Sequence, residues 1–266
     1  MGTRTSLEVV VSGGTGYMGR RMIAELVRRG HTVTALVRRG SEAKVPYGAN
    51  PRVADVFDAE SFVGAIPQGA VFVHLTGVAH PAPWKERQFR AVDLASLRAS
   101  AVAAARANAG HFVYVSVAHP APVMKAYIRV RRECEAILDT FGLQRTILRP
   151  WYVLGPGHRW PAILAPLYRG FESMKSTRES ALRLGTVTIQ EMTDALIWSV
   201  EQDPVSLRIL DVPAIRTAGR PASEAAGSRR SGSGGPSFHR GRDHRGQAPS
   251  RDVAERVSVA PATAGK

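Results

Sequence analysis

The sequence has little cysteine and no long apolar run, the features that disulfide-stabilised and membrane-spanning proteins need. Its 266 residues include a single cysteine, Cys134, so no internal disulfide can form and a reducing compartment is expected. No apolar run reaches the roughly 20 residues that span a bilayer, and the N-terminus lacks the apolar core of a signal peptide. We therefore expect a cytoplasmic protein with no membrane span, in which Cys134 is a buried, unreactive thiol on a helix.

Acidic residues are also scarce, with 22 Asp and Glu against 36 Lys and Arg, which gives a formal net charge of +14. Nine of these cations and four of these acids lie in residues 217–266, where Gly, Ser, Arg, Pro and Ala dominate and Phe238 is the only aromatic residue. Such a segment cannot bury enough apolar surface to fold. We predict a folded domain over 1–216 and a disordered basic tail over 217–266. The tail faintly resembles arginine-glycine segments that bind nucleic acid, but without interleaved aromatic residues such a role is disfavoured.

The most informative stretch is residues 7–20, LEVVVSGGTGYMGR. Its three consecutive valines predict a strand buried on both faces, and the glycines begin where that strand should end. Gly13 permits a tight turn, Gly16 a close approach of backbone N–H groups to a pyrophosphate, and Gly19 close helix packing. This spacing predicts a dinucleotide site whose residues are Gly13, Gly14, Thr15, Gly16, Tyr17, Met18 and Gly19.

The following residues strengthen that prediction because they supply the remaining parts of a βαβ unit. Residues 17–29 have an apolar helical stripe that ends at Gly30, and residues 32–37, TVTALV, form a second strand. The unit is about thirty residues long and must be right-handed if its strands are parallel. We predict an α/β Rossmann fold, a doubly wound parallel sheet with a small substrate-side extension from about residue 150.

Arg38 and Arg39 follow the second strand, and no acid appears before Glu42. A carboxylate at this position accepts hydrogen bonds from the ribose of NAD, whereas a cation meets the 2′-phosphate of NADP. The sequence therefore favours NADP(H), with Arg38 as the contact and NAD(H) still possible. The alternative is a solvated basic pair at a strand end.

Two more strands contribute candidate cofactor contacts. Asp55 and Val56, at the end of a strand over 52–55, suit the adenine, while Asp58 is predicted to cap a helix over 59–66. A strand over 70–75 ends in small residues where the cofactor ribose would pass, including Thr76 and Gly77. A long amphipathic helix over about 86–108 follows.

The predicted chemical centre lies after the strand over 111–116, which ends in Ser116. A helix beginning near Val123 carries Tyr127 and Arg131 four residues apart, and therefore on one face. Lowering a phenol pKa from about 10 to about 7 requires roughly 4 kcal/mol, which one cation about 4 Å away can supply. A guanidinium cannot relay a proton, because it does not deprotonate in proteins. The alternative is a surface tyrosine and arginine on an amphipathic helix.

Four strings together resemble the extended and atypical short-chain dehydrogenase/reductases over about residues 7–216: GGTGYMG, VSVAHP, YIRVRRECE and TILRPWYVLGPG. The resemblance implies a glycine-rich NAD(P) loop, a serine after the fifth strand, a Tyr-x-x-x-Lys pair and a strand ending in Arg-Pro. Ser116 and Tyr127 stand where the family has its serine and tyrosine. Arg131 replaces the family lysine, and Glu135 keeps the usual position four residues later.

Two departures point to the atypical branch, which includes epimerase/dehydratase-like reductases, NmrA-like cofactor sensors and proteins similar to the 39-kDa subunit of respiratory complex I. Arg131 stands in place of a lysine that also binds the nicotinamide ribose, and Asp93 stands where many members have asparagine. These changes leave cofactor binding intact as a prediction but put turnover in doubt.

The substrate side is expected to start at a strand over 146–149, with a loop through residue 157 that closes over the nicotinamide. Its aromatic residues are interpreted either as pocket walls or as packing: Trp151, Tyr152, His158 and Trp160. His80 and His119 occur in matching Val-Ala-His-Pro strings and are candidates to reach substrate. No third ligand accompanies them, so no metal site is predicted. Elements over 184–188, 189–200 and 208–212 complete a small extension, which disfavours a nucleotide-sugar substrate.

Two hypotheses about function follow. The first is an NADP(H)-dependent oxidoreductase acting on a small carbonyl, alcohol or quinone-like compound, with Ser116 orienting the substrate oxygen, Tyr127 exchanging the proton and Arg131 stabilising the phenolate. The second is a sensor or assembly factor that binds NADP(H) without chemistry. A homodimer is possible, because helices flanking the tyrosine often pair in this superfamily.

Overall fold

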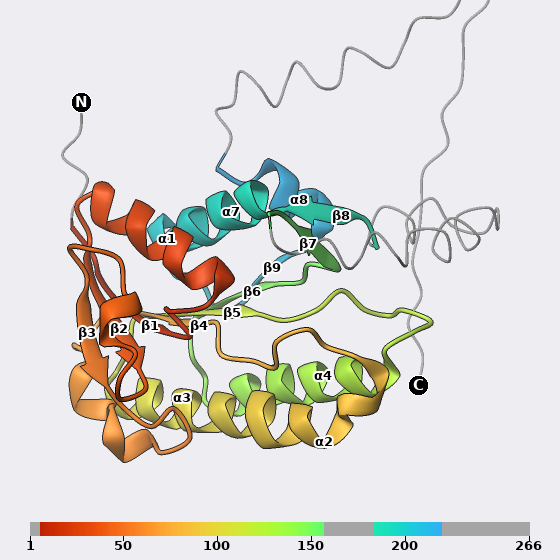
Figure 1. Cartoon of the computed structure of the whole chain (residues 1–266), viewed down its shortest axis with the longest axis horizontal. Helices are drawn as coiled ribbons and strands as arrows, with labels where there is room; N and C mark the ends of the chain where they lie inside the picture. Colours follow the sequence, from red (N-terminus) through yellow and green to blue (C-terminus); the bar gives the residue numbers. More distant parts are fainter. Residues whose placement is uncertain (1–5, 157–183, 220–266) are drawn as a thin grey trace, which may run out of the picture.

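The computed structural model describes residues 6–156 and 184–219. Its centre is a seven-stranded sheet in the order β3-β2-β1-β4-β5-β6-β9, in which every neighbouring pair is parallel (Figure 1). The strands are β1 Glu8–Ser12, β2 Thr32–Val37, β3 Asn50–Val53, β4 Val71–His74, β5 His111–Val115, β6 Arg145–Leu148 and β9 Arg208–Leu210. The predicted α/β Rossmann fold is therefore confirmed.

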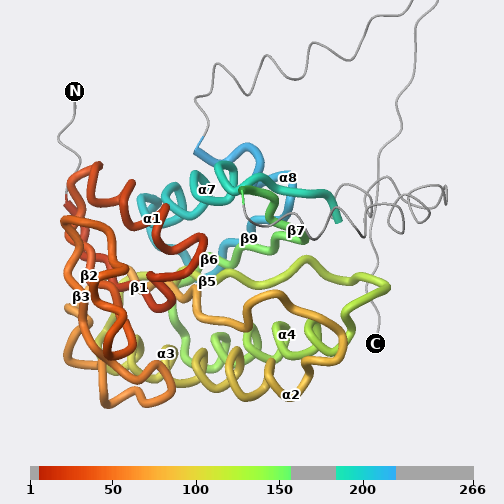
Figure 2. Tube along the Cα trace, viewed as in Figure 1, coloured from red at the N-terminus to blue at the C-terminus, as the bar shows by residue number. Residues whose placement is uncertain are grey.

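Helices cover both faces of the sheet. One face carries α1 Tyr17–Arg28, α7 Ile189–Glu201 and α8 Val212–Thr217; the other carries α2 Glu86–Gln88, the π-helical turn η5 Phe89–Leu94, α3 Ala95–Arg106 and α4 Lys125–Thr140. Although far apart in sequence, α1 and α7 lie side by side, and α7 also contacts α8 (Figure 2). The chain thus folds into three layers, with the sheet between two helical layers.

The β1 strand shows why this sequence forms a two-sided sheet. Val9 and Val11 point to the core under α1 and α7, whereas Val10 points to the core under α3 and α4. Successive side chains of a strand alternate between faces, so a run of valines has buried positions on both sides. All three valines are 1% exposed or less.

Three expectations about elements are corrected. Residues 59–66 form no α-helix but two 3₁₀ turns, η2 Ala59–Ser61 and η3 Val63–Ala65, although Asp58 does cap the first by accepting from the Glu60 N–H at 3.0 Å. The long helix expected over 86–108 contains the π turn η5 and ends at Arg106. The last strand stops at Leu210, because Asp211 caps α8 through the Ala214 N–H.

The remaining described elements lie on the substrate side. A two-stranded parallel sheet joins β7 Tyr152–Leu154 to β8 Thr186–Thr188, and short 3₁₀ turns occur at η1 Glu42–Lys44 and η4 Pro83–Lys85. The predicted boundary at residue 216 falls one residue before the end of α8, and positions 220–266 of the predicted tail lie outside the described residues. None of the helices in the described ranges is long and apolar enough to cross a membrane.

Candidate functional site

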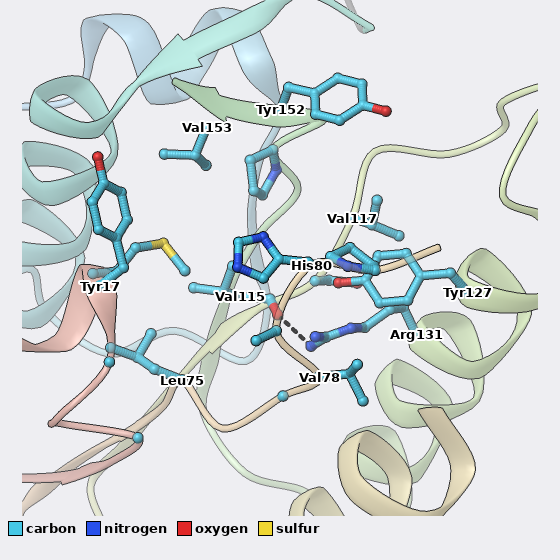
Figure 3. Close-up of a pocket in the computed structure, with 18 of the residues that line it drawn as sticks. Tyr17, Leu75, Val78, His80, Val115, Val117, Tyr127, Arg131, Tyr152 and Val153 are labelled. Carbon is cyan, nitrogen blue, oxygen red and sulfur yellow. Dashed lines mark hydrogen bonds between the residues drawn. The ribbon is translucent and has the colours of Figure 1, made fainter. Parts of the chain in front are cut away.

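A pocket of about 310 Å³ opens at the carboxyl edge of the sheet (Figure 3). It lies beside the ends of β1, β4, β5 and β6, where the strand order reverses, and this is where ligands bind in doubly wound folds. The residues that line it come from the glycine loop and α1, the β4 end, the β5 end, α4 and the β6 end: Gly13, Gly16–Gly19, Leu75, Gly77–Pro81, Val115–Val117, Tyr127, Arg131 and Pro150–Val153. The sequence-predicted loop and catalytic residues thus meet at one site.

The glycine loop has the geometry that the motif predicts. Gly13 has a φ of +78°, and a Cβ added to it would lie 2.7 Å from the Leu75 carbonyl carbon. A Cβ at Gly19 would lie 2.5 Å from the Gly13 oxygen, so only glycine lets α1 start this close to β1. The Gly16 N–H donates to that same oxygen at 3.0 Å. Gly14 instead packs under the helix, where a Cβ would meet the Ile23 side chain at 2.7 Å.

This cradle fits the pyrophosphate of a dinucleotide. The first N–H groups of an α-helix have no partner within the helix and carry its positive dipole end, and α1 begins at Tyr17 with no acidic residue in its first turn. A second observation agrees with a ligand here: the Thr76 hydroxyl oxygen is buried with no hydrogen-bond partner in the described structure, and its backbone lies against Gly13. Thr15 and Thr76 do not themselves line the pocket.

The residues predicted for the adenosine end lie outside the pocket, along the same sheet edge. Arg38 is exposed immediately after β2. Its neighbour Val37 accepts a hydrogen bond from the Ala54 N–H at 2.9 Å, which brings the ends of β2 and β3 together. The Asp55 carboxylate accepts from the Phe57 N–H at 3.0 Å, and Val56 is half-buried beside it. The fold therefore places Arg38 and Asp55 on adjacent strand ends.

Arg131 is a buried cation whose two terminal nitrogens have three partners. It donates to the Val115 carbonyl at 2.9 Å, drawn as a dashed line in Figure 3, and to the Tyr114 hydroxyl at 3.1 Å. Its other terminal nitrogen lies 2.6 Å from the Asp93 carboxylate. Gly77 permits this approach, because a Cβ there would lie 2.7 Å from that nitrogen. The pKa of Asp93 is nevertheless raised, because burial outweighs the attraction of Arg131.

Tyr127 stands over Arg131, with the guanidinium carbon 5.0 Å from the centre of the phenol ring (Figure 3). The expectation that this cation brings the phenol pKa towards neutrality is wrong in this geometry. Burial raises the pKa of Tyr127, Arg131 lowers it by less, and Asp93 raises it further. A cation that is shared with a carboxylate cannot offset the loss of water around the phenol.

Ser116 lies at the end of β5 and lines the pocket with 3% exposure. Its hydroxyl donates to the Glu135 carboxylate at 2.5 Å, and Glu135 also accepts two hydrogen bonds from Arg149, the longer at 3.2 Å. His119 contacts the same carboxylate at 3.6 Å, while burial lowers the His119 pKa. The structure thus separates the two histidines: His80 lines the pocket, whereas His119 lies outside it, beside Glu135.

Of the predicted aromatic pocket walls, Trp151 and Tyr152 line the pocket and meet edge to face, with ring centres 5.5 Å apart. His158 and Trp160 lie outside the described residues. Within the part of the chain that the structure describes, no three His, Cys, Asp or Glu side chains come together as metal ligands. Cys134 is buried, as predicted, and burial raises its pKa to about 11.

Sequence reasoning missed the partners that hold the catalytic candidates. The sequence predicts Tyr114 only as part of the strand over 111–116, and the resemblance gives Glu135 no role in the site. A signal for Glu135 was present, because its spacing from Arg131 puts both on one face of α4, and Arg149 ends the next strand. No spacing rule predicts that the two chain segments meet.

Comparison with known proteins agrees with this geometry. Residues 13–169 match the model of a family described as NAD(P)H-binding. Divinyl chlorophyllide a 8-vinyl-reductase from Oryza sativa subsp. indica is 33% identical over 41% of this chain and 29% of its own length. Ceramide reductase from Caulobacter vibrioides is 28% identical over 56% of this chain and 47% of its own. The matched regions thus span less than half of these relatives.

Among solved structures, a short-chain dehydrogenase/reductase superfamily protein from Agrobacterium tumefaciens with bound NAD covers 79% of this chain, and the match covers 80% of that protein. The TM-score is 0.56 at 17% sequence identity, a likeness that concerns the fold. The family match covers more than half of the chain and contains the glycine loop, Ser116, Tyr127 and Arg131. The chain therefore belongs to this NAD(P)H-binding family.

Proposed function

We propose that this protein is an NADP(H)-dependent oxidoreductase acting on a small carbonyl, alcohol or quinone-like compound. The observation that carries the proposal is that one pocket joins the glycine loop to Ser116 and Tyr127. The names of the two sequence relatives, both reductases, agree with it. Most other residues around the substrate end of the pocket are apolar, for example Val117, Pro150 and Val153, which suits a small uncharged substrate.

The residues at the ends of β2 and β3 support a preference for NADP(H) over NAD(H). The pyrophosphate is held by Gly13–Gly19 and the N-terminus of α1, and the ribose lies beside Thr76 and Gly77. Arg38, exposed after β2, binds the 2′-phosphate, and Asp55 with Val56 contacts the adenine. When bound, the cofactor supplies or accepts the hydride. The preferred form is NADP(H), because an arginine matches a phosphate in charge and geometry.

At the reacting end, Ser116 orients the substrate oxygen and Tyr127 exchanges the proton. Tyr127 lines the pocket, and its hydroxyl carries the proton that a carbonyl oxygen needs when it is reduced. Arg131 lies against the ring of Tyr127 and stabilises the phenolate that remains. Because a guanidinium does not give up its proton, the phenol must recover its own from another group.

The test is turnover by the full chain in a carbonyl and quinone panel with NADPH. Replacing Tyr127 by Phe removes the exchangeable proton and should lower kcat by about a hundredfold or more. Tyr47→Phe is the matched control, because Tyr47 is fully exposed and lies outside the pocket, and it should leave turnover unchanged. Equal turnover in Tyr127→Phe and the parent chain would contradict the mechanism.

A second function is favoured by one observation, the ion pair between Arg131 and the buried Asp93. This pair occupies the cation that a working tyrosine needs, so the chain could bind NADP(H) as a sensor or assembly factor without chemistry. The two functions differ in one measurable respect. A sensor binds NADPH but consumes none with any compound of the panel, whereas substrate-dependent consumption excludes the sensor.

A further inference from the structure

The hydrogen bond between Ser116 and Glu135 has only one possible direction. A carboxylate accepts hydrogen bonds and donates none, so the hydrogen must come from the serine hydroxyl. The donor–acceptor distance of 2.5 Å is short, as is usual for a hydroxyl bound to a charged oxygen. The single hydrogen of Ser116 therefore points to Glu135, and only its oxygen lone pairs remain for another partner.

Glu135 is held firmly enough to impose that direction. Its two oxygens meet two nitrogens of Arg149, at 3.2 and 2.5 Å, and its side chain is nearly buried on α4. Arg149 directly follows β6, and its guanidinium donates to both oxygens of the carboxylate. Rotating Ser116 away would leave a buried carboxylate oxygen with one partner fewer.

We infer that Glu135 is a positioning residue that makes Ser116 a hydrogen-bond acceptor towards the pocket. A ligand hydroxyl can donate to Ser116, whereas a ligand carbonyl oxygen cannot receive a hydrogen from it. The pocket therefore prefers an alcohol over the matching ketone, and Tyr127 is left as the hydroxyl donor for a carbonyl oxygen. The ligand preference rests on the proposed function, while the orientation of the hydroxyl does not.

The orientation can be tested without any substrate. In NMR spectra of the full chain labelled in serine, the Ser116 hydroxyl proton should give a downfield, slowly exchanging signal, assigned by its loss in Ser116→Ala. Glu135→Gln should shift this signal upfield or abolish it, because a neutral amide oxygen is a weaker acceptor than a carboxylate oxygen. Glu133→Gln is the control on the same helix: its partners are the surface residues Arg90 and Arg98, and the signal should not move.

If Glu135→Gln does not fold, Glu135→Asp retains the charge but withdraws it by one methylene, and the signal should again move upfield. A signal that is unchanged in the variant that folds would overturn the inference. The absence of a downfield signal in the parent chain would do the same.

The consequence is tested with 1-phenylethanol and acetophenone, titrated into the chain without cofactor so that neither compound is converted into the other. The alcohol should bind about fivefold more tightly, the value of one ordinary hydrogen bond. This ratio should fall to about one in Ser116→Ala and Glu135→Gln and persist in Glu133→Gln. A ratio that Glu135→Gln leaves unchanged contradicts the inference. If neither compound binds, the proposed substrate class fails, and the NMR result alone decides the role of Glu135.

Discussion

His74 is a buried histidine at the end of β4, and its ring contacts β1 and α3. Its Nδ1 lies 3.0 Å from the hydroxyls of both Ser12 and Ser100, and its ring is 1% exposed. Burial, and then the nearby charge of Arg131, lower its pKa from 6.5 to about 3. His111, at the start of β5, is similar, since burial lowers its pKa to about 4.

Because the pKa values of these two histidines are lowered in the folded chain, we predict that the chain loses stability in mild acid. The folded pKa of His74 lies below the unfolded value, so protons bind the unfolded chain first. The contribution of His74 to the free energy of unfolding is fully present above pH 6.5 and is lost as the pH falls towards 3. Urea unfolding should give a free energy about 2 kcal/mol lower per histidine at pH 5 than at pH 7.5. In His74→Asn this drop should shrink by about that amount; an equal drop in both chains would refute the assignment.

At the residue scale, the sequence predicts which side chains meet but not how they are satisfied. Ser116, Tyr127 and Arg131 share one pocket, as the motifs indicate. The phenol pKa could not be predicted, because it depends on burial and on Asp93, which reaches Arg131 from another helix. A Coulomb estimate for one pair of groups leaves out the cost of desolvation, and in this site that cost raises the Tyr127 pKa.

At the scale of elements, the π turn η5 is what delivers Asp93. A π turn widens a helix by one residue and often occurs at functional sites. Here it belongs to a helix that the sequence presents as continuous, with Phe89, Asp93 and Leu94 buried. Amphipathic periodicity predicts the helix, but it cannot reveal the inserted residue, because packing against α4 and the Arg131 charge select it.

The start of α1 provides a sharp prediction for an element. Gly19→Ala should raise helix propensity yet destabilise the chain by about 1–2 kcal/mol, because the new methyl meets rigid backbone. The clash is with the Gly13 oxygen, 2.5 Å from the added Cβ, so the loop must shift and NADPH affinity should fall at least about tenfold. Urea unfolding and an NADPH titration measure the two effects.

Gly64→Ala is the matched control for this change. A Cβ there meets nothing within 4 Å, and its backbone does not have a positive φ. This variant should retain parental stability and affinity to within experimental error. If Gly19→Ala behaves like Gly64→Ala, the glycine loop does not depend on the close approach of α1 to β1.

The sequence predicts the sheet better than its connections. Hydrophobic runs such as β1 and β2 are local and lie within a residue or two of their predicted positions. The sequence predicts a helix over 59–66 because a cap followed by alanine and glutamate suits the start of a helix, whereas Pro67 ends the segment after two single turns. Register and strand order come from nonlocal pairing and could be argued only from the βαβ rule.

At the scale of the whole molecule, three far-apart segments converge at one sheet edge. The glycine loop contributes the phosphate cradle, the β5 end and α4 contribute Ser116 and Tyr127, and Arg38 extends the edge towards β3. The roles proposed for these residues all require one extended ligand that lies across these strand ends. The family match supports an NAD(P)H ligand, and we propose that Arg38 selects between its two forms.

The central claim is tested most directly by titrating the purified full chain with NADPH and with NADH in a calorimeter. We predict saturable binding of both, with NADPH about tenfold tighter or more, since a charged hydrogen-bonded contact is worth about 1.5–3 kcal/mol. Arg38→Gln should remove most of the difference without changing the NADH affinity. Equal or tighter binding of NADH by the parent chain would contradict the assigned preference. No binding of either cofactor would contradict the account as a whole.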